Sequence, residues 1–194
     1  MEHDIPIRKM AFGFPEEINP VIRRGFPEES FFYLGLSAIL PYLEPYLIRT
    51  MKAAAEGIDD PSLREQATRF MSQEGQHYQQ HIKFNRACGL NDVPEVRALE
   101  EGIGRAFDHY TKTKSLRFNL AYAEAFEAAT TAVALGGFAT RVFDEMDSFS
   151  SNIWQWHLVE ELEHRTVAFD VYDHLCGGYW YRLGIGLFAQ LGQG

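Results

Sequence analysis

Two segments of this chain place glutamate and histidine side chains one helical turn apart. At about 100° per residue, positions three, four and seven apart share one face of an α-helix. The triples are Glu74, His77 and His81 in FMSQEGQHYQQH, and His157, Glu161 and His164 in WQWHLVEELEHRT. Such side chains are costly to bury unless another group binds them. The fold must therefore either expose both faces to water or bring them together around metal ions.

Glutamates on two further helical segments favour the metal interpretation. Glu44 lies in LPYLEPYLIRTM and Glu127 in EAFEAATTAVA, both among apolar or small residues. Two Glu-x-x-His pairs, with one Glu from each of two other helices, form the ligand set of dinuclear metal sites in four-helix bundles. Exposed charge on amphipathic helices would explain either pair alone, but not this combination. The sequence predicts two metal ions, with Glu74 and Glu161 as the expected bridges between them.

The spacing of apolar residues predicts an all-α fold with four core helices and further connecting and terminal helices. The sequence contains no strand-like alternation, internal repeat or low-complexity segment. Ser30 can cap the first helix, and Asp60 followed by Pro61 marks the start of the second. Pro41 and Pro45 should kink the first helix or break it into two pieces.

Proline and glycine placement predicts the domain organisation. Residues 1–29 carry several of both and are expected to form an irregular arm, lying on one helical domain at residues 30–194. The last clear core helix is expected at residues 152–176. The apolar segment after it stops in mid-pattern, so we expect the final helix to be cut short.

Charge and cysteine content exclude several classes of protein. The net charge of −9 argues against general nucleic-acid binding, which needs a basic face. The two cysteines, Cys88 and Cys176, are far apart, which argues against a disulfide framework and favours the cytoplasm. We see no signal peptide and no run of about 18 apolar residues, so no integral membrane segment is expected.

Several glutamates compete for places at the predicted site. Glu124 lies three residues before Glu127 on the same helix face, and it is either a second ligand or an outer partner. We prefer Glu127, because small residues continue its side of the helix. Only Glu161 is in phase with both histidines of the last motif, so Glu160 and Glu163 are expected to be outer or solvated groups.

The two motifs carry more histidines than a minimal dinuclear site requires. His157 lies one turn before Glu161, and we predict that it is a third imidazole ligand. His81 is more typical of a hydrogen-bonded histidine in a core or on a surface, and its role as a ligand stays open.

The chain resembles a known family at these residues. The quoted segments, with LSAILPYLEPYLIR and DDPSLREQATRF, resemble blocks of the bacterial "predicted metal-dependent hydrolase" family, a ferritin-like group. The resemblance covers about residues 30–175, and QEGQH and HLVEELEHR are its most specific parts. It implies a ferritin-like four-helix bundle. The ligands that it implies are Glu44, Glu74, His77, Glu127, Glu161 and His164.

A second resemblance concerns one motif only. The spacing from His157 through Glu161 to His164 is similar to that in dinuclear iron arylamine N-oxygenases, in which an extra histidine joins the site. One departure from the hydrolase-like family precedes the first ligand. That family tends to have Pro-x-Gly-Glu, whereas this chain has Pro41, Tyr42, Leu43 and Glu44.

These patterns support three functions. We favour an enzyme with two divalent ions, expected to be iron with manganese or zinc as alternatives, that uses O₂ to oxidise a small organic substrate held among aromatic side chains. The first alternative is hydrolysis by a metal-activated water, with Glu124 or Glu160 moving a proton. The second is a non-catalytic bundle that stores metal. A homodimer stays open.

Overall fold

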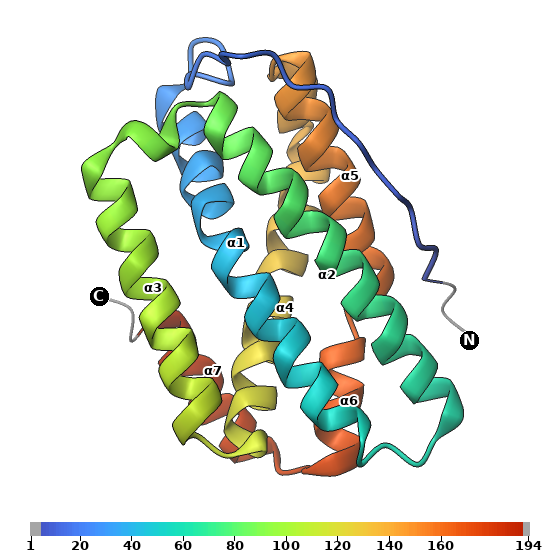
Figure 1. Ribbon diagram of the computed structural model, residues 1–194. Helices are drawn as coiled ribbons and strands as arrows, with labels where there is room; N and C mark the ends of the chain where they lie inside the picture. Colours follow the sequence, from blue (N-terminus) through green and yellow to red (C-terminus); the bar gives the residue numbers. More distant parts are fainter. Residues whose placement is uncertain (1–4, 192–194) are drawn as a thin grey trace.

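The computed structural model describes residues 5–191, and within that range the chain is all-α, as predicted (Figure 1). Helices α1 and α2 lie in front of α4 and α5 in this view, α3 flanks α1, and α6 and α7 complete the far side. No β-strand forms between residues 5 and 191. The helices are α1 (Pro27–Ala55), α2 (Pro61–Ala87), α3 (Pro94–Thr113), α4 (Leu116–Thr140), α5 (Ser148–His164), α6 (Val167–Leu175) and α7 (Tyr179–Leu191).

Side-chain caps and prolines set most of the helix starts. Asp60 accepts hydrogen bonds from the backbone at the start of α2, as predicted, and Asp147 does the same for α5. The prediction that Ser30 caps α1 is wrong, because α1 begins three residues earlier at Pro27. Proline suits a first helical position for two reasons. Its fixed φ is helical, and an N–H at that position would have no acceptor within the helix, so its absence costs no hydrogen bond.

Helix α1 runs without interruption through both of its internal prolines. Pro41 has no N–H, so the carbonyl of Ser37, four residues earlier, loses its helical partner. Asn85 of α2 replaces that partner, because its Nδ2 donates to this carbonyl at 2.8 Å. Glu44 thereby stays on a continuous helix, buried between Pro41 and Pro45.

The predicted helix at residues 152–176 is two helices. A turn at Arg165 and Thr166 separates α5 from α6, directly after His164. The last ligand candidate is therefore the final residue of α5. The expected truncation of the last helix concerns residues 192–194, which lie outside the described range.

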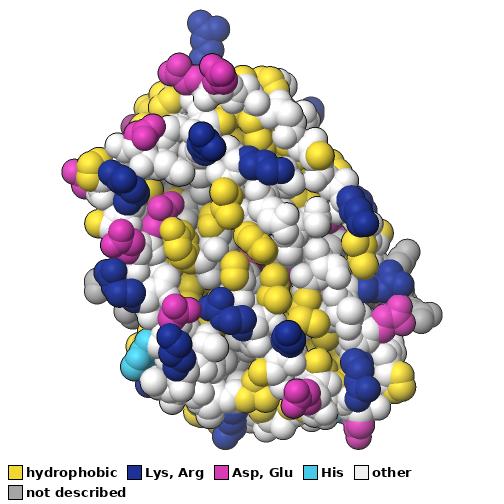
Figure 2. All heavy atoms as spheres, viewed as in Figure 1, with side chains coloured by type: hydrophobic (Ala, Val, Ile, Leu, Met, Phe, Trp, Pro, Cys, Tyr) yellow, Lys and Arg dark blue, Asp and Glu magenta, His cyan; other side chains and the backbone are white. Residues whose placement is uncertain are grey.

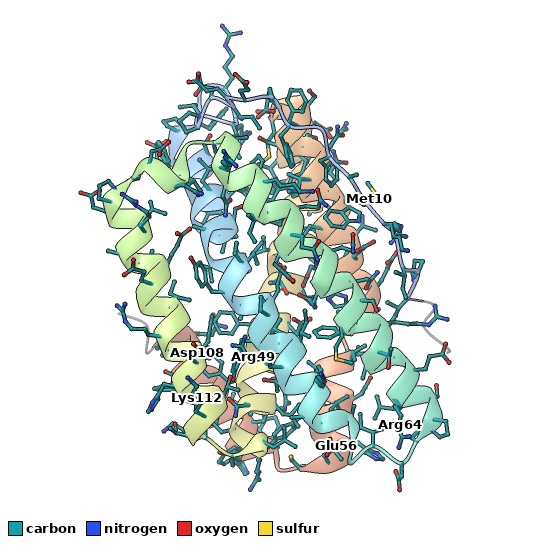
Figure 3. All side chains as sticks on the ribbon, in the orientation of Figure 1. Met10, Arg49, Glu56, Arg64, Asp108 and Lys112 are labelled. Atoms are coloured by element: carbon teal, nitrogen blue, oxygen red, sulfur yellow. The ribbon has the colours of Figure 1, made fainter. Side chains whose placement is uncertain are left out.

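The N-terminal segment lies along α2 and α5 (Figure 1). The carbonyl of Met10, labelled in Figure 3, accepts from Gln80 Nε2 at 2.9 Å, and Ile18 N donates to the carbonyl of Ala87 at 2.8 Å. Ile5 and Ile18 of this segment are buried. The division into an arm at residues 1–29 and a domain at 30–194 stays a prediction.

Helix α1 is the one described helix that is long and apolar enough to cross a membrane, by length and composition alone. No unbroken apolar run marks it in the sequence, and the expectation that no segment spans a membrane stays a prediction. In the structure α1 contacts α2, α3 and α4, and Arg49 of α1 pairs with Asp108 of α3 at 3.5 Å (Figure 3). Its apolar side chains are therefore those of a bundle helix.

The face of the molecule seen in Figure 2 carries acidic and basic side chains interspersed with apolar ones.

Candidate metal centre

The four helices α1, α2, α4 and α5 bring the predicted ligands together in the interior of the bundle. Each of these side chains belongs to a residue that is no more than 2% exposed. Helix α1 provides one residue, α2 two, α4 one and α5 three. In that order they are Glu44, Glu74, His77, Glu127, His157, Glu161 and His164.

The donor atoms form two neighbouring groups, within each of which the atoms lie no more than 4.8 Å apart. The first group contains Glu44, His77 and His157, and the second contains Glu74, Glu161 and His164. Glu127 adjoins the second group, because its Oε2 lies 3.4 Å from His164 Nε2.

Among the described residues, buried polar atoms without a hydrogen-bond partner concentrate at this cluster. Buried atoms of this kind cost free energy unless another group compensates them. At the cluster they are both oxygens of Glu44 and of Glu74, one oxygen each of Glu127 and Glu161, Nδ1 of His77 and Nε2 of His164, and the others are Nε1 of Trp154 and of Trp156.

Hydrogen bonds to the outer nitrogen of His164 fix its orientation. Its Nδ1 lies 2.8 Å from Gln73 Oε1, a carbonyl oxygen that can only accept, so Nδ1 carries the proton. In the neutral imidazole the lone pair is then on Nε2, which lies 3.1 Å from an oxygen of Glu74, 3.4 Å from one of Glu127 and 3.6 Å from one of Glu161. This nitrogen and three carboxylates face one another.

The same arrangement recurs at His77. Its Nε2 donates to Oε2 of the buried Glu160 at 3.0 Å, which leaves Nδ1 as the atom facing the interior. Nδ1 lies 3.8 Å from Glu74 Oε1 and 3.6 Å from Glu161 Oε1. Arg8 of the N-terminal segment holds Glu160 in turn, through a contact of 3.0 Å.

A chain of hydrogen bonds orients His157. Asn85 directs its amide nitrogen at the Ser37 carbonyl, so its oxygen accepts from the Ser37 hydroxyl. That hydroxyl then accepts from His81 Nδ1 at 2.7 Å. His81 Nε2 therefore accepts from His157 Nδ1 at 2.8 Å, and His157 Nε2 is left facing Glu161 Oε1 at 3.0 Å. Both nitrogens of His81 are engaged, which makes it an outer partner in this structure.

The pKa directions show what the cluster lacks. Burial and neighbouring carboxylates hold the pKa of Glu44 and of Glu74 well above the usual value, and raise that of Glu127 to about 7. Burial alone would lower the pKa of His164, but the carboxylates around it outweigh burial and raise it. Burial alone would raise the pKa of Glu161, but the imidazoles of His164 and His157 together outweigh burial and hold it well below 4.5. The cluster requires positive charge.

Divalent ions satisfy this requirement. Iron, manganese and zinc bind carboxylate oxygens and neutral imidazole nitrogens in proteins. The other nitrogen of such an imidazole usually donates its N–H to an outer partner, as the imidazoles do here. Two such ions would balance four carboxylates. The residues present therefore suit a dinuclear centre.

Three other candidates lie outside the donor groups. Glu124 pairs with Arg182 of α7, and Glu163 pairs with Arg8 at 2.7 Å. Glu160 contacts the cluster only through the outer nitrogen of His77. Their assignments, including catalytic roles for Glu124 and Glu160, stay predictions.

Glu160 was expected among the outer groups, but Gln73, Asn85 and Arg8 were not identified from the sequence, although α2 carried a signal for the first two. Gln73, His77, His81 and Asn85 follow one another at four-residue spacing and are all buried. Such a run of polar residues on one helix face indicates a buried polar network. Arg8 is far from the cluster in sequence, and nothing in the pattern pointed to it.

We expect His157→Ala to keep both metal ions while changing their surroundings. The other donors remain, but one coordination position opens, which alters the electronic environment of the ion. The measurement is metal content together with the visible absorption spectrum of Co(II)-substituted protein. An unchanged spectrum would identify His157 as an ordinary packed histidine.

Comparison with known proteins identifies the family. A family model described as predicted metal-dependent hydrolase matches residues 6–192. No curated protein and no solved structure matches the chain. The chain therefore belongs to the predicted metal-dependent hydrolase family, and its buried Glu and His groups can bind metal. The comparisons give no support to oxidation chemistry.

Proposed function

We propose that this chain is a hydrolase that works with two divalent ions at the buried cluster. The observation that carries the proposal is the set of donor atoms without partners, contributed by four helices and facing one another. Four carboxylates in an apolar bundle leave a charge that two divalent ions neutralise. The family description supports hydrolysis as the reaction.

The donor groups suggest how the ions are held. One ion would bind Glu44, His77 and His157, and the other would bind His164 with Glu127. Glu74 and Glu161 lie close to both His77 and His164, so they are suited to bridge the ions. The order Glu, Glu-x-x-His, Glu, Glu-x-x-His along the chain is that of ferritin-like bundles, and we propose that fold family here.

Bound ions would activate a water molecule and polarise the bond to be cleaved. The residues of the chain would hold this centre, and their burial would limit its access to water. Glu160 accepts from His77 and is held by Arg8, so it positions the imidazole. Glu124 is paired with Arg182 and is not close to the donor atoms. A proton-transfer role therefore has more support at Glu160 than at Glu124.

O₂-dependent oxidation by a di-iron centre is the second candidate. The specific observation in its favour is the third imidazole, His157, which faces Glu161 within the cluster. It matches the resemblance of this motif to arylamine N-oxygenases. A small-molecule substrate, a cytoplasmic location and a homodimer remain expectations under either chemistry. Gel filtration would separate both from metal storage, which needs a shell of many subunits.

Hydrolysis should proceed without O₂. We expect protein loaded with Zn(II) or Mn(II) under nitrogen to cleave at least one of a panel of activated carboxylic and phosphoric esters, while Glu161→Ala does not. Fe(II)-loaded protein, mixed anaerobically and then exposed to O₂, tests the rival. Turnover that depends on O₂, with no cleavage by the zinc or manganese forms, would contradict the hydrolase proposal.

A further inference from the structure

A cavity of about 130 Å³ lies between α1, α4 and α5. One face of each helix lines it, with side chains three or four residues apart. On α1 they include Ile39 and Leu43, on α4 Phe126 and Ala129, and on α5 Trp154. Its walls are almost entirely apolar.

The cavity adjoins the first donor group. His157 lines it, and His157 Nε2 lies 3.8 Å from Glu44 Oε1. Leu43, another lining residue, directly precedes Glu44 on α1. The exposed Gln190 of α7 also contributes to the lining, so the cavity has both a surface residue and a residue of the donor group in its wall.

The hydroxyl of Thr130 and the amide nitrogen of Gln190 are already engaged, whereas the indole N–H of Trp154, another lining residue, is buried without a hydrogen-bond partner among the described residues. The Thr130 hydroxyl donates to the carbonyl of Glu127 at 3.1 Å, and Gln190 Nε2 donates to the carbonyl of Ala125 at 3.0 Å. Among residues 5–191, no lysine, arginine, aspartate or glutamate lines the cavity. A charged group, or one that needs several hydrogen bonds, would therefore be poorly solvated there.

The volume limits what can enter. An engineered protein cavity of about 150 Å³ lined by Leu, Ile and Phe stays dry and binds benzene. The cavity here is slightly smaller and similarly lined, so it suits an apolar group of about six carbons.

We propose that this cavity is the substrate-binding subsite, and that the substrate carries an uncharged, apolar group of about six carbons beside the bond that reacts. The proposal rests on the proposed function for the role of the donor cluster. Binding in the cavity places one end of the substrate beside His157 and Glu44 and leaves its other end towards α7.

Fluorobenzene is a suitable probe, because ¹⁹F NMR detects its binding in the presence or absence of metal. We expect the Zn(II)-loaded protein to bind it, and Ala129→Phe, which fills the cavity, to weaken binding by about tenfold or more. Ala132→Phe is the matched control, since Ala132 is exposed on the same helix and does not line the cavity. Absence of binding to wild type, or equal binding by both variants, would overturn the proposal.

An enlarging variant tests the size limit. Ile39→Ala removes three carbons from the wall, so the variant should admit 1-butyl-4-fluorobenzene. Wild type should bind this longer probe about tenfold more weakly than the variant does. Equal binding of this longer probe by both proteins would mean that the cavity does not set the size of the ligand.

Replacing Zn(II) with paramagnetic Mn(II) tests the position of the probe. The ¹⁹F line of bound fluorobenzene should broaden strongly, because the cavity adjoins the donor cluster. If fluorobenzene binds to protein that contains manganese and its ¹⁹F line does not broaden further, the proposal that this cavity is the substrate subsite is overturned. Fluorobenzene binding by protein that takes up no metal would contradict the proposed function and leave cavity binding intact.

Discussion

Glu161→Ala is expected to lose most of its bound metal while keeping its helical content. Glu161 Oε1 lies 3.0 Å from His157 Nε2 and 3.6 Å from both His77 Nδ1 and His164 Nε2. No other carboxylate in the cluster contacts all three imidazoles in this structure, so its removal weakens both ion positions. Outer partners of a metal site typically contribute about 10–100-fold in affinity, and a bridging ligand should contribute more. The measurement is elemental analysis after dialysis, with circular dichroism for helical content.

Glu163→Ala is the matched control on the same helix. Glu163 accepts from Arg8 and Gln73 and does not contact the donor atoms, so this variant should retain two ions and lose at most about tenfold in affinity. His164→Ala should behave like Glu161→Ala. Loss of metal in Glu163→Ala with retention in Glu161→Ala would show that the phase assigned to α5 is wrong.

Metal removal should destabilise the protein, and more so as the pH rises. The usual pKa of a histidine is about 6.5, and above this pH the unfolded chain has lost the protons of its carboxyl and imidazole groups. Four groups of the cluster have raised pKa values and still bind protons in the folded chain. They are Glu44, Glu74, Glu127 and His164. The folded state then holds more protons than the unfolded state, so the stability of the metal-free protein falls with increasing pH.

Bound metal should reverse this dependence. Metal binds these groups only after they have lost their protons, so metal binding strengthens as the pH rises. The lowered pKa values of His77 and His81 act only below pH 6.5, where they oppose the trend. We expect metal to raise Tm by about 10–20 °C at about pH 8 and by less at pH 6.5. Thermal unfolding with and without a chelator measures both values. A metal-free Tm that rises over this interval would contradict the account.

Helical periodicity allowed much of the donor cluster to be predicted. Glu74 and His77 are in phase on one helix, as Glu161 and His164 are on another, and the phase fixes which side chains can meet. It also separated Glu161 from Glu160 and Glu163. Whether these residues bind metal is still a prediction, but the structure places their donor atoms together.

The outer partners depend on contacts that periodicity does not encode. Arg8 reaches Glu160 across 152 positions in sequence, because the N-terminal segment lies along α2 and α5. Asn85 contacts the Ser37 carbonyl because Pro41 leaves that carbonyl free, a consequence visible only once α1 and α2 are packed together.

The site of a helix start depends on competing local preferences. Ser30 is a good cap by residue type, but Pro27 suits the first helical position and begins α1 earlier. The Ser30 hydroxyl instead donates to the Phe26 carbonyl, one turn back along the chain.

A crystal structure of Mn(II)- or Zn(II)-loaded protein, with anomalous scattering recorded at the edge of the metal, tests the dinuclear centre most directly. The account predicts two anomalous peaks within about 4 Å of each other. One should lie against Glu44, His77 and His157, and the other against Glu127 and His164. A single peak, or peaks only at the protein surface, would contradict it.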